Sequence, residues 1–262
     1  MIRTLCIVMV VGLLATPARA DVTITAQVTG KGLGKAAESQ SITYIKGLKM
    51  RSDSTLGDTP TTTIIDIDAQ KFISINHKKK EASVIAMAQF RQDLDKAVKS
   101  DEVKASLKPN TEKKEIAGRA CNGYDLAVAT PMALGGDATM TMVMTGPVFI
   151  AKGAPGSGDY VAFYLAAAEK GFITSGDPRA AKGAPQQVKG MTALHKAIAD
   201  TGGIPYFMEM SMKIEGAGPM AAMMNKMMGG SAFSQTVTAV TTDTIAATTF
   251  DVPAGYKLKD SK

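Results

Sequence analysis

The chain has 262 residues, of which 45% are hydrophobic and 21% charged, and its formal net charge is +6. This length suits one large domain or two small ones. The basic excess is mild and most lysines are scattered, so the composition does not favour a nucleic-acid-binding protein.

The first predicted element is a signal peptide. Arg3 supplies a positive n-region, residues 5–14 form an apolar core, and small residues end at Ala20. These are the parts of a Sec signal, so we expect export to the periplasm and cleavage after Ala20. The apolar run is shorter than the roughly 20 residues that span a bilayer. Cys6 lies inside this run, away from the cleavage point, so we expect a mature protein without a lipid or membrane anchor.

Alternating apolar and polar residues then predict a series of strands separated by short turns. This spacing is typical of an antiparallel meander. The predicted strands cover residues 21–28, 41–50, 61–68, 71–76 and 81–86.

The pattern changes at Met87. Residues 87–107 contain no Gly or Pro and have apolar residues at helical spacing, which predicts one or two amphipathic helices. Further helices are expected at 157–173, at 186–200 and, as a short helix or a mobile loop, at 220–228. The remaining segments favour strands, at 113–130, 138–150, 205–215, 234–246 and 248–258.

No repeat or linker divides residues 21–262, so we expect a single α+β domain. Its architecture would be a large curved antiparallel β-sheet with helices on one face.

Several phrases of the sequence occur in the order typical of a known family. They are YIKGLKMR at 44–51, IIDID at 64–68 with KFI at 71–73, INHKKK at 75–80, IAGRACNGY at 116–124 and FDVPAGYK at 250–257. On these phrases the chain resembles the DUF4412 family of exported bacterial proteins. That family is similar to the periplasmic lipoprotein carrier (LolA/LolB-like) fold, a half-open antiparallel barrel with helices packed on its concave face. The resemblance implies binding of a lipid-like ligand and supplies no catalytic residues or cofactor.

The sequence offers little for catalysis. Gly156-Ser157-Gly158 lacks the G-x-S-x-G pattern of a nucleophile elbow. Cys121 could form a nucleophile pair with His77 or His195, but a buried strand cysteine is the preferred interpretation. We therefore expect a protein that is not an enzyme.

Hard-metal binding is a second, minor hypothesis. Asp66 and Asp68 share one face of a predicted strand and could bind a cation together with Asp58. Their place at a strand end favours solvated side chains instead, so we expect no such site.

The 17 methionines are the most unusual feature of the sequence. Two M-x-M-x-M triplets each place three thioethers on one face of a strand, and a third group has helical spacing. Thioethers could line an adaptable apolar pocket, bury in an ordinary core, or bind Cu(I) or Ag(I). The groups are Met140, Met142 and Met144; Met208, Met210 and Met212; and Met220, Met223, Met224, Met227 and Met228.

Two further hypotheses concern the mouth of such a pocket. The apolar segment 219–230 is bounded by glycines and could act as a lid. Arg51 could meet an anionic head group at the rim, or be a solvated strand end.

The sequence therefore favours a periplasmic carrier of an apolar ligand, such as a lipid or lipoprotein acyl chains. The alternatives are a methionine-rich Cu(I)/Ag(I)-binding protein and a structural component of the envelope that binds no small ligand. The pattern does not indicate an oligomeric state or a protein partner.

Overall fold

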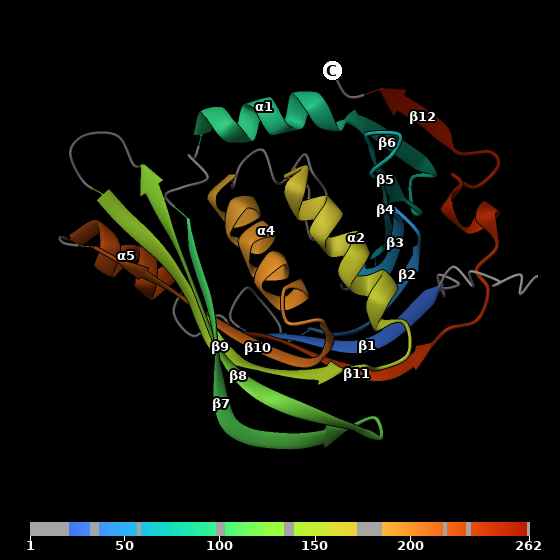
Figure 1. The fold of residues 1–262 in the computed structure, drawn as a ribbon. Coiled ribbons are helices and arrows are strands. Elements are labelled where there is room, and N and C mark those ends of the chain that lie inside the picture. Colours follow the sequence, from blue (N-terminus) through green and yellow to red (C-terminus); the bar gives the residue numbers. More distant parts are fainter. Residues whose placement is uncertain are drawn as a thin grey trace, which may run out of the picture.

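The computed structural model describes residues 21–31, 37–56, 59–97, 103–133, 139–171, 185–216, 219–228 and 232–260 (Figure 1). The predicted signal peptide, residues 1–20, lies outside these ranges.

The described strands form one 12-stranded sheet that does not close on itself. Every neighbouring pair is antiparallel except β12 and β6, which are parallel. The order across the sheet is β12-β6-β5-β4-β3-β2-β1-β11-β10-β9-β8-β7. The strands are β1 (Val22–Lys31), β2 (Ala37–Lys46), β3 (Lys49–Leu56), β4 (Thr59–Asp66), β5 (Lys71–Asn76), β6 (Glu81–Ala86), β7 (Lys104–Ile116), β8 (Arg119–Ala133), β9 (Thr139–Lys152), β10 (Gly203–Glu215), β11 (Ala232–Thr241) and β12 (Lys257–Asp260).

Helices α2 and α4 pack on each other and on the sheet, α4 against β7, β8 and β10 and α2 against β2 and β10 (Figure 1). Helix α1 directly follows β6 and also contacts α4, while α5 packs on β10. The predicted α+β class with a large antiparallel sheet is confirmed. The α-helices are α1 (Met87–Ala97), α2 (Ser157–Glu169), α4 (Pro185–Ala199) and α5 (Pro219–Met228).

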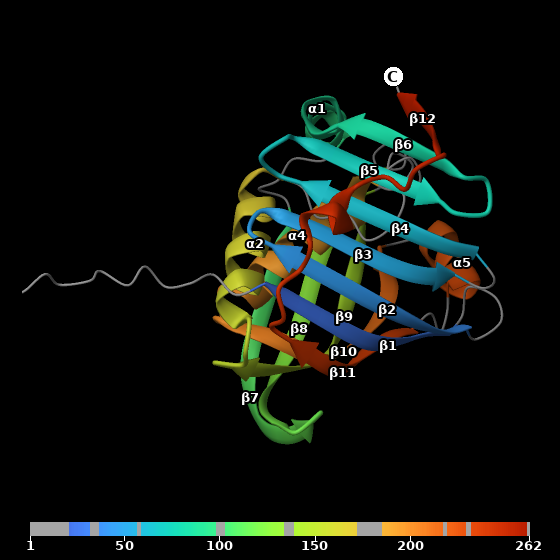
Figure 2. The same ribbon diagram turned by 90° about the vertical axis from the view of Figure 1, so that its right-hand side faces the viewer.

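Two apolar clusters lie on the described sheet. The larger one joins buried side chains of the strands with those of the four described α-helices. The smaller one joins Ile64, Ile75 and Ala82 to Ile245 and Phe250 of the C-terminal segment. Figure 2 shows this segment crossing strands of the sheet before it reaches β12. Packing on this face holds the chain end to the strands.

Two predicted elements were correct only in part. Helix α1 ends at Ala97, and residues 104–107 already belong to strand β7. Residues 104–107 pair with residues 126–129 of β8, so pairing in the sheet rather than a helical period fixes them.

The second error lies near the C-terminus. The predicted strand 248–258 is instead a short 3₁₀ helix, Ala247–Phe250, an irregular stretch, and β12. Phe250 is buried against strand residues, so tertiary packing rather than pairing fixes this stretch.

Candidate functional site

The two strand triplets of methionines form one continuous apolar surface. β9 and β10 are neighbours, and their register places Met144 opposite Met212 and Met142 opposite Ile214. Five of the six thioether side chains are buried and Met212 is half-buried. The buried ones are Met140, Met142, Met144, Met208 and Met210.

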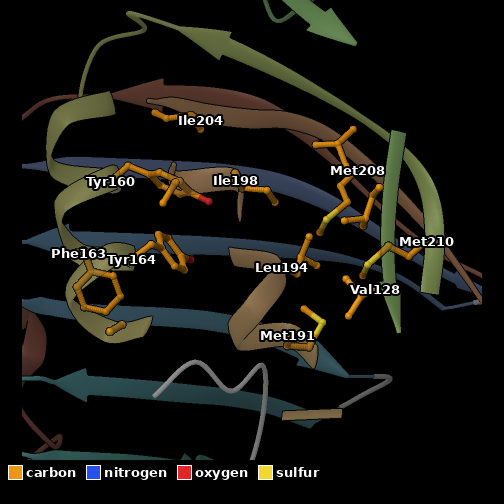
Figure 3. Close-up of a cluster of buried hydrophobic side chains, with 14 of the residues drawn as sticks. Val128, Tyr160, Phe163, Tyr164, Met191, Leu194, Ile198, Ile204, Met208 and Met210 are labelled. Atoms are coloured by element: carbon orange, nitrogen blue, oxygen red, sulfur yellow. The ribbon is translucent and has the colours of Figure 1, made fainter. Parts of the chain in front are cut away.

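Helix α4 covers this methionine surface. Gly190 lies so close to the strands that an added Cβ would be 3.1 Å from Cε of Met144 and 3.0 Å from Oγ1 of Thr130. Figure 3 shows Leu194 of α4 beside Met208 and Val128. The absence of a side chain at Gly190 therefore lets the helix approach the flexible thioethers directly.

Two polar atoms of the described residues are buried in this region without a hydrogen-bond partner. They are Oγ1 of Thr130 on β8 and Nδ1 of His195 on α4. Thr130 is opposite Met142 in the sheet and is fully buried. His195 keeps some exposed surface, but its Nδ1 is buried. Buried polar groups normally have partners, so these two atoms mark places where a bound molecule could be recognised.

Helix α2 places two tyrosines next to His195. The ring of Tyr164 stacks on the imidazole at 4.8 Å between centroids, and the ring of Tyr160 is 4.4 Å from that of Tyr164. The Tyr164 hydroxyl donates to Sδ of Met50 at 3.6 Å. A chain of contacts therefore runs through the interior from His195 of α4, through Tyr164 of α2, to Met50 of β3.

Burial keeps these groups uncharged at neutral pH. It lowers the pKa of His195 to about 4, raises the pKa of Tyr164 to about 12, and raises the pKa of Tyr160 well above its ordinary value. Neutral donors and acceptors of this kind suit an uncharged ester, amide or carboxylic acid better than an ion. Tyr160 and Tyr164 were not predicted as site residues from the sequence, although their i, i+4 spacing on a predicted helix was a usable signal.

The methionines of α5 lie apart from the strand surface. Met220 and Met223 are each 52% exposed, and Met224 is half-buried against the larger cluster. The side chains of Met227 and Met228 lie outside the described part of the chain. Asn225 fixes the helix to β10, because its side-chain amide donates to the carbonyl of Ile214 and accepts from the Ile214 amide, at 2.6 and 2.8 Å.

Arg51 lies on the opposite face of the sheet from the strand methionines. Its neighbour Met50 belongs to the larger cluster, and strand side chains alternate between faces. The guanidinium donates to Asp53 at 2.9 Å and to the carbonyl of Thr249 at 2.8 Å. Arg51 therefore ties the C-terminal segment to β3, and we leave it out of the candidate site.

Residues from the sequence phrases quoted above meet on that same face. Oγ1 of Thr62 donates to the carboxylate of Asp53 and lies 2.8 Å from Nε2 of His77, whose Nδ1 is 2.9 Å from the Tyr256 hydroxyl. Because the carboxylate can only accept, Thr62 accepts from Nε2–H and Tyr256 donates to Nδ1. Arg51, His77 and Tyr256 come from three of the quoted phrases and together anchor the chain end.

The residues considered for catalysis and for binding a hard metal ion make local contacts. Cys121 is buried, its thiol donates to the carbonyl of Arg119, and burial raises its pKa. Asp66 accepts from the amide of Ala69 and pairs with Lys49. Within the described ranges no group of His, Cys, Asp and Glu could hold a metal ion. Asp58 lies outside those ranges.

None of the described helices is both long and apolar enough to cross a membrane. A comparison with protein-family models gives no match. A comparison with curated proteins gives none either.

Proposed function

We propose that the protein is a non-enzymatic periplasmic carrier of an apolar ligand, a lipid or lipoprotein acyl chain. In this proposal the sheet acts as a half-open barrel, with α2 and α4 on its concave face, and the ligand enters between α4 and the methionine surface. The observation that carries the proposal is the unpartnered hydroxyl of Thr130 inside this apolar surface.

The methionine surface supports binding of a flexible chain. A thioether side chain has several rotatable bonds and a polarisable sulfur, so it repacks around different apolar shapes at little cost. Met142 and Met144 lie directly next to Thr130 and Val128 in the sheet register. The acyl chain of a ligand and its polar linkage could therefore be recognised at one place.

The position of Gly190 supports a route for entry. Helix α4 contacts the strands here through side-chain packing. It is not joined to the sheet by the backbone hydrogen bonds that pair neighbouring strands. A ligand could displace α4 outward while the backbone hydrogen bonds of both elements stay intact.

The unpartnered atoms support recognition of a polar linkage within the ligand. A buried polar group without a partner costs about 1–3 kcal/mol, and a ligand carbonyl accepting from Thr130 would remove that cost. Neutral His195 offers a second such group. This favours an ester or amide of a long chain over a plain hydrocarbon.

The test compares Thr130→Val with the wild type and with Thr238→Val, whose hydroxyl is exposed. Binding of a long-chain ester and of an alkane of equal length is measured by displacement of a fluorescent apolar probe. We expect Thr130→Val to weaken ester binding roughly threefold to tenfold, as loss of one hydrogen bond predicts. Alkane binding should stay unchanged, and Thr238→Val should match the wild type for both ligands.

Two results would count against the proposal. Failure of the wild type to bind either ligand would remove the carrier function. Equal ester binding by Thr130→Val and the wild type would show that the hydroxyl is only a core group.

A further inference from the structure

The methionines of α5 differ from the strand methionines in their access to solvent. Met220 and Met223 are each 52% exposed, whereas the buried methionines of β9 and β10 are at most 8% exposed. Any ligand that methionine sulfur atoms bind from solution therefore meets α5 first.

Three methionine side chains of α5 project from one side of the helix. Each residue of an α-helix advances about 100°, so Met220, Met223 and Met224 fall within an arc of about 100°. Ala221 is buried and Asn225 bonds to the backbone of β10, so the opposite side of the helix is the anchored one.

The spacing brings the three side chains within reach of one another. Residues at i, i+3 and i+4 have Cβ atoms about 5–6 Å apart, and the long methionine side chains can close that gap. Met227 continues the same spacing in the sequence, at i+7 from Met220.

Thioether sulfur is a soft, neutral ligand that selects soft metal ions such as Cu(I). It carries no proton to release, so binding does not depend on a titrating group. Lys226 is exposed on the same helix and adds positive charge, which penalises a divalent ion more than a monovalent one.

From these observations we propose that the exposed Met220 and Met223 and the half-buried Met224 bind one soft monovalent cation, Cu(I) or Ag(I), on α5. The five buried methionines of β9 and β10 take no part, because they are at most 8% exposed. This site is independent of the proposed carrier function, and the ion binds without any change in its oxidation state.

The test uses Ag(I), which is stable in air, with residues 21–262 of the chain. Ag(I) stoichiometry and affinity are measured by native mass spectrometry and competitive titration, and methionine methyl resonances are followed by NMR. The site variant replaces Met220, Met223 and Met224 together by leucine. The control variant replaces Met140, Met142 and Met144 by leucine and so removes the same number of sulfur atoms.

We expect the wild type and the control variant to bind one Ag(I), with shifts in the methyl resonances of the α5 methionines. The site variant should lose at least tenfold in affinity. Leucine keeps the apolar character and nearly the volume of methionine, so circular dichroism should show all three proteins folded. No Ag(I) binding by the wild type, undiminished binding by the site variant, or loss of binding in the control variant would each overturn the proposal.

Discussion

At the scale of single residues, a few polar side chains set the chemistry of the interior. Thr130, Tyr160, Tyr164 and His195 lie between helices and strands whose other facing residues are mostly apolar. Each stays uncharged at neutral pH, so the interior can recognise a polar linkage without the cost of a buried ion.

His195 makes the stability of the fold depend on pH. Burial lowers its pKa to about 4 in the folded protein, against about 6.5 for an unperturbed histidine. Between these two values His195 binds more protons in the unfolded chain than in the folded protein. The stabilising contribution of the neutral imidazole is therefore complete above pH 6.5 and is lost as the pH falls towards 4. From this residue we expect the free energy of unfolding to fall by about 2 kcal/mol between pH 7 and pH 5.

Urea denaturation of the wild type and of His195→Phe at pH 7 and pH 5 tests this expectation. The phenyl ring can keep the stack on Tyr164, so the variant should fold and should show a smaller loss at pH 5. An equal loss in both proteins would show that His195 does not carry the pH dependence.

The residue scale is also where the sequence was least informative. The M-x-M-x-M alternation predicted strands that are present at 139–152 and 203–215. Nothing local indicated that Gly190 would let α4 approach Thr130, because that contact joins residues 60 positions apart. Arg51 likewise gave no signal that its partner would be the carbonyl of Thr249.

At the scale of elements, the strands and helices follow their local periodicity, and the exceptions have tertiary causes. β7 contains Pro109 and several exposed lysines, which is typical of an edge strand. Its first residues continue the helical composition of α1, and only their pairing with β8 distinguishes them. The predicted 220–228 helix is present as α5, and it is held by the buried Ala221, the half-buried Met224 and the hydrogen bonds of Asn225 to β10.

Asn225→Ala should loosen α5 without unfolding the sheet. The change removes two hydrogen bonds to Ile214, together about 2 kcal/mol, so local opening should rise by roughly tenfold or more. Trypsin cleavage after Lys226, which requires the helix to open, reports this rise.

The matched control is Met223→Leu, on the exposed side of the same helix, and its cleavage rate should equal that of the wild type. The urea midpoint should change little in either variant. Equal cleavage of Asn225→Ala and the wild type would show that packing, rather than the amide of Asn225, holds α5.

At the scale of the whole molecule, one open sheet supports two separate layers. Helices and methionines fill the larger cluster, while the C-terminal segment crosses the other face and ends in a parallel pairing with β6. The α+β class followed from the sequence, because runs of alternating residues were numerous. The strand order and the path of the C-terminal segment did not, because pairing partners far apart in the chain leave no local pattern.

The carrier proposal depends on a ligand entering between α4 and the methionine surface, and native mass spectrometry tests this most directly. Residues 21–262, which form the mature periplasmic chain in this proposal, are purified without detergent and analysed intact. We predict an adduct that has the mass of a lipid and fragments as one, and that Thr130→Val retains in smaller amount. A bare polypeptide mass from such a preparation, which stays unchanged after incubation with long-chain esters, would contradict the account.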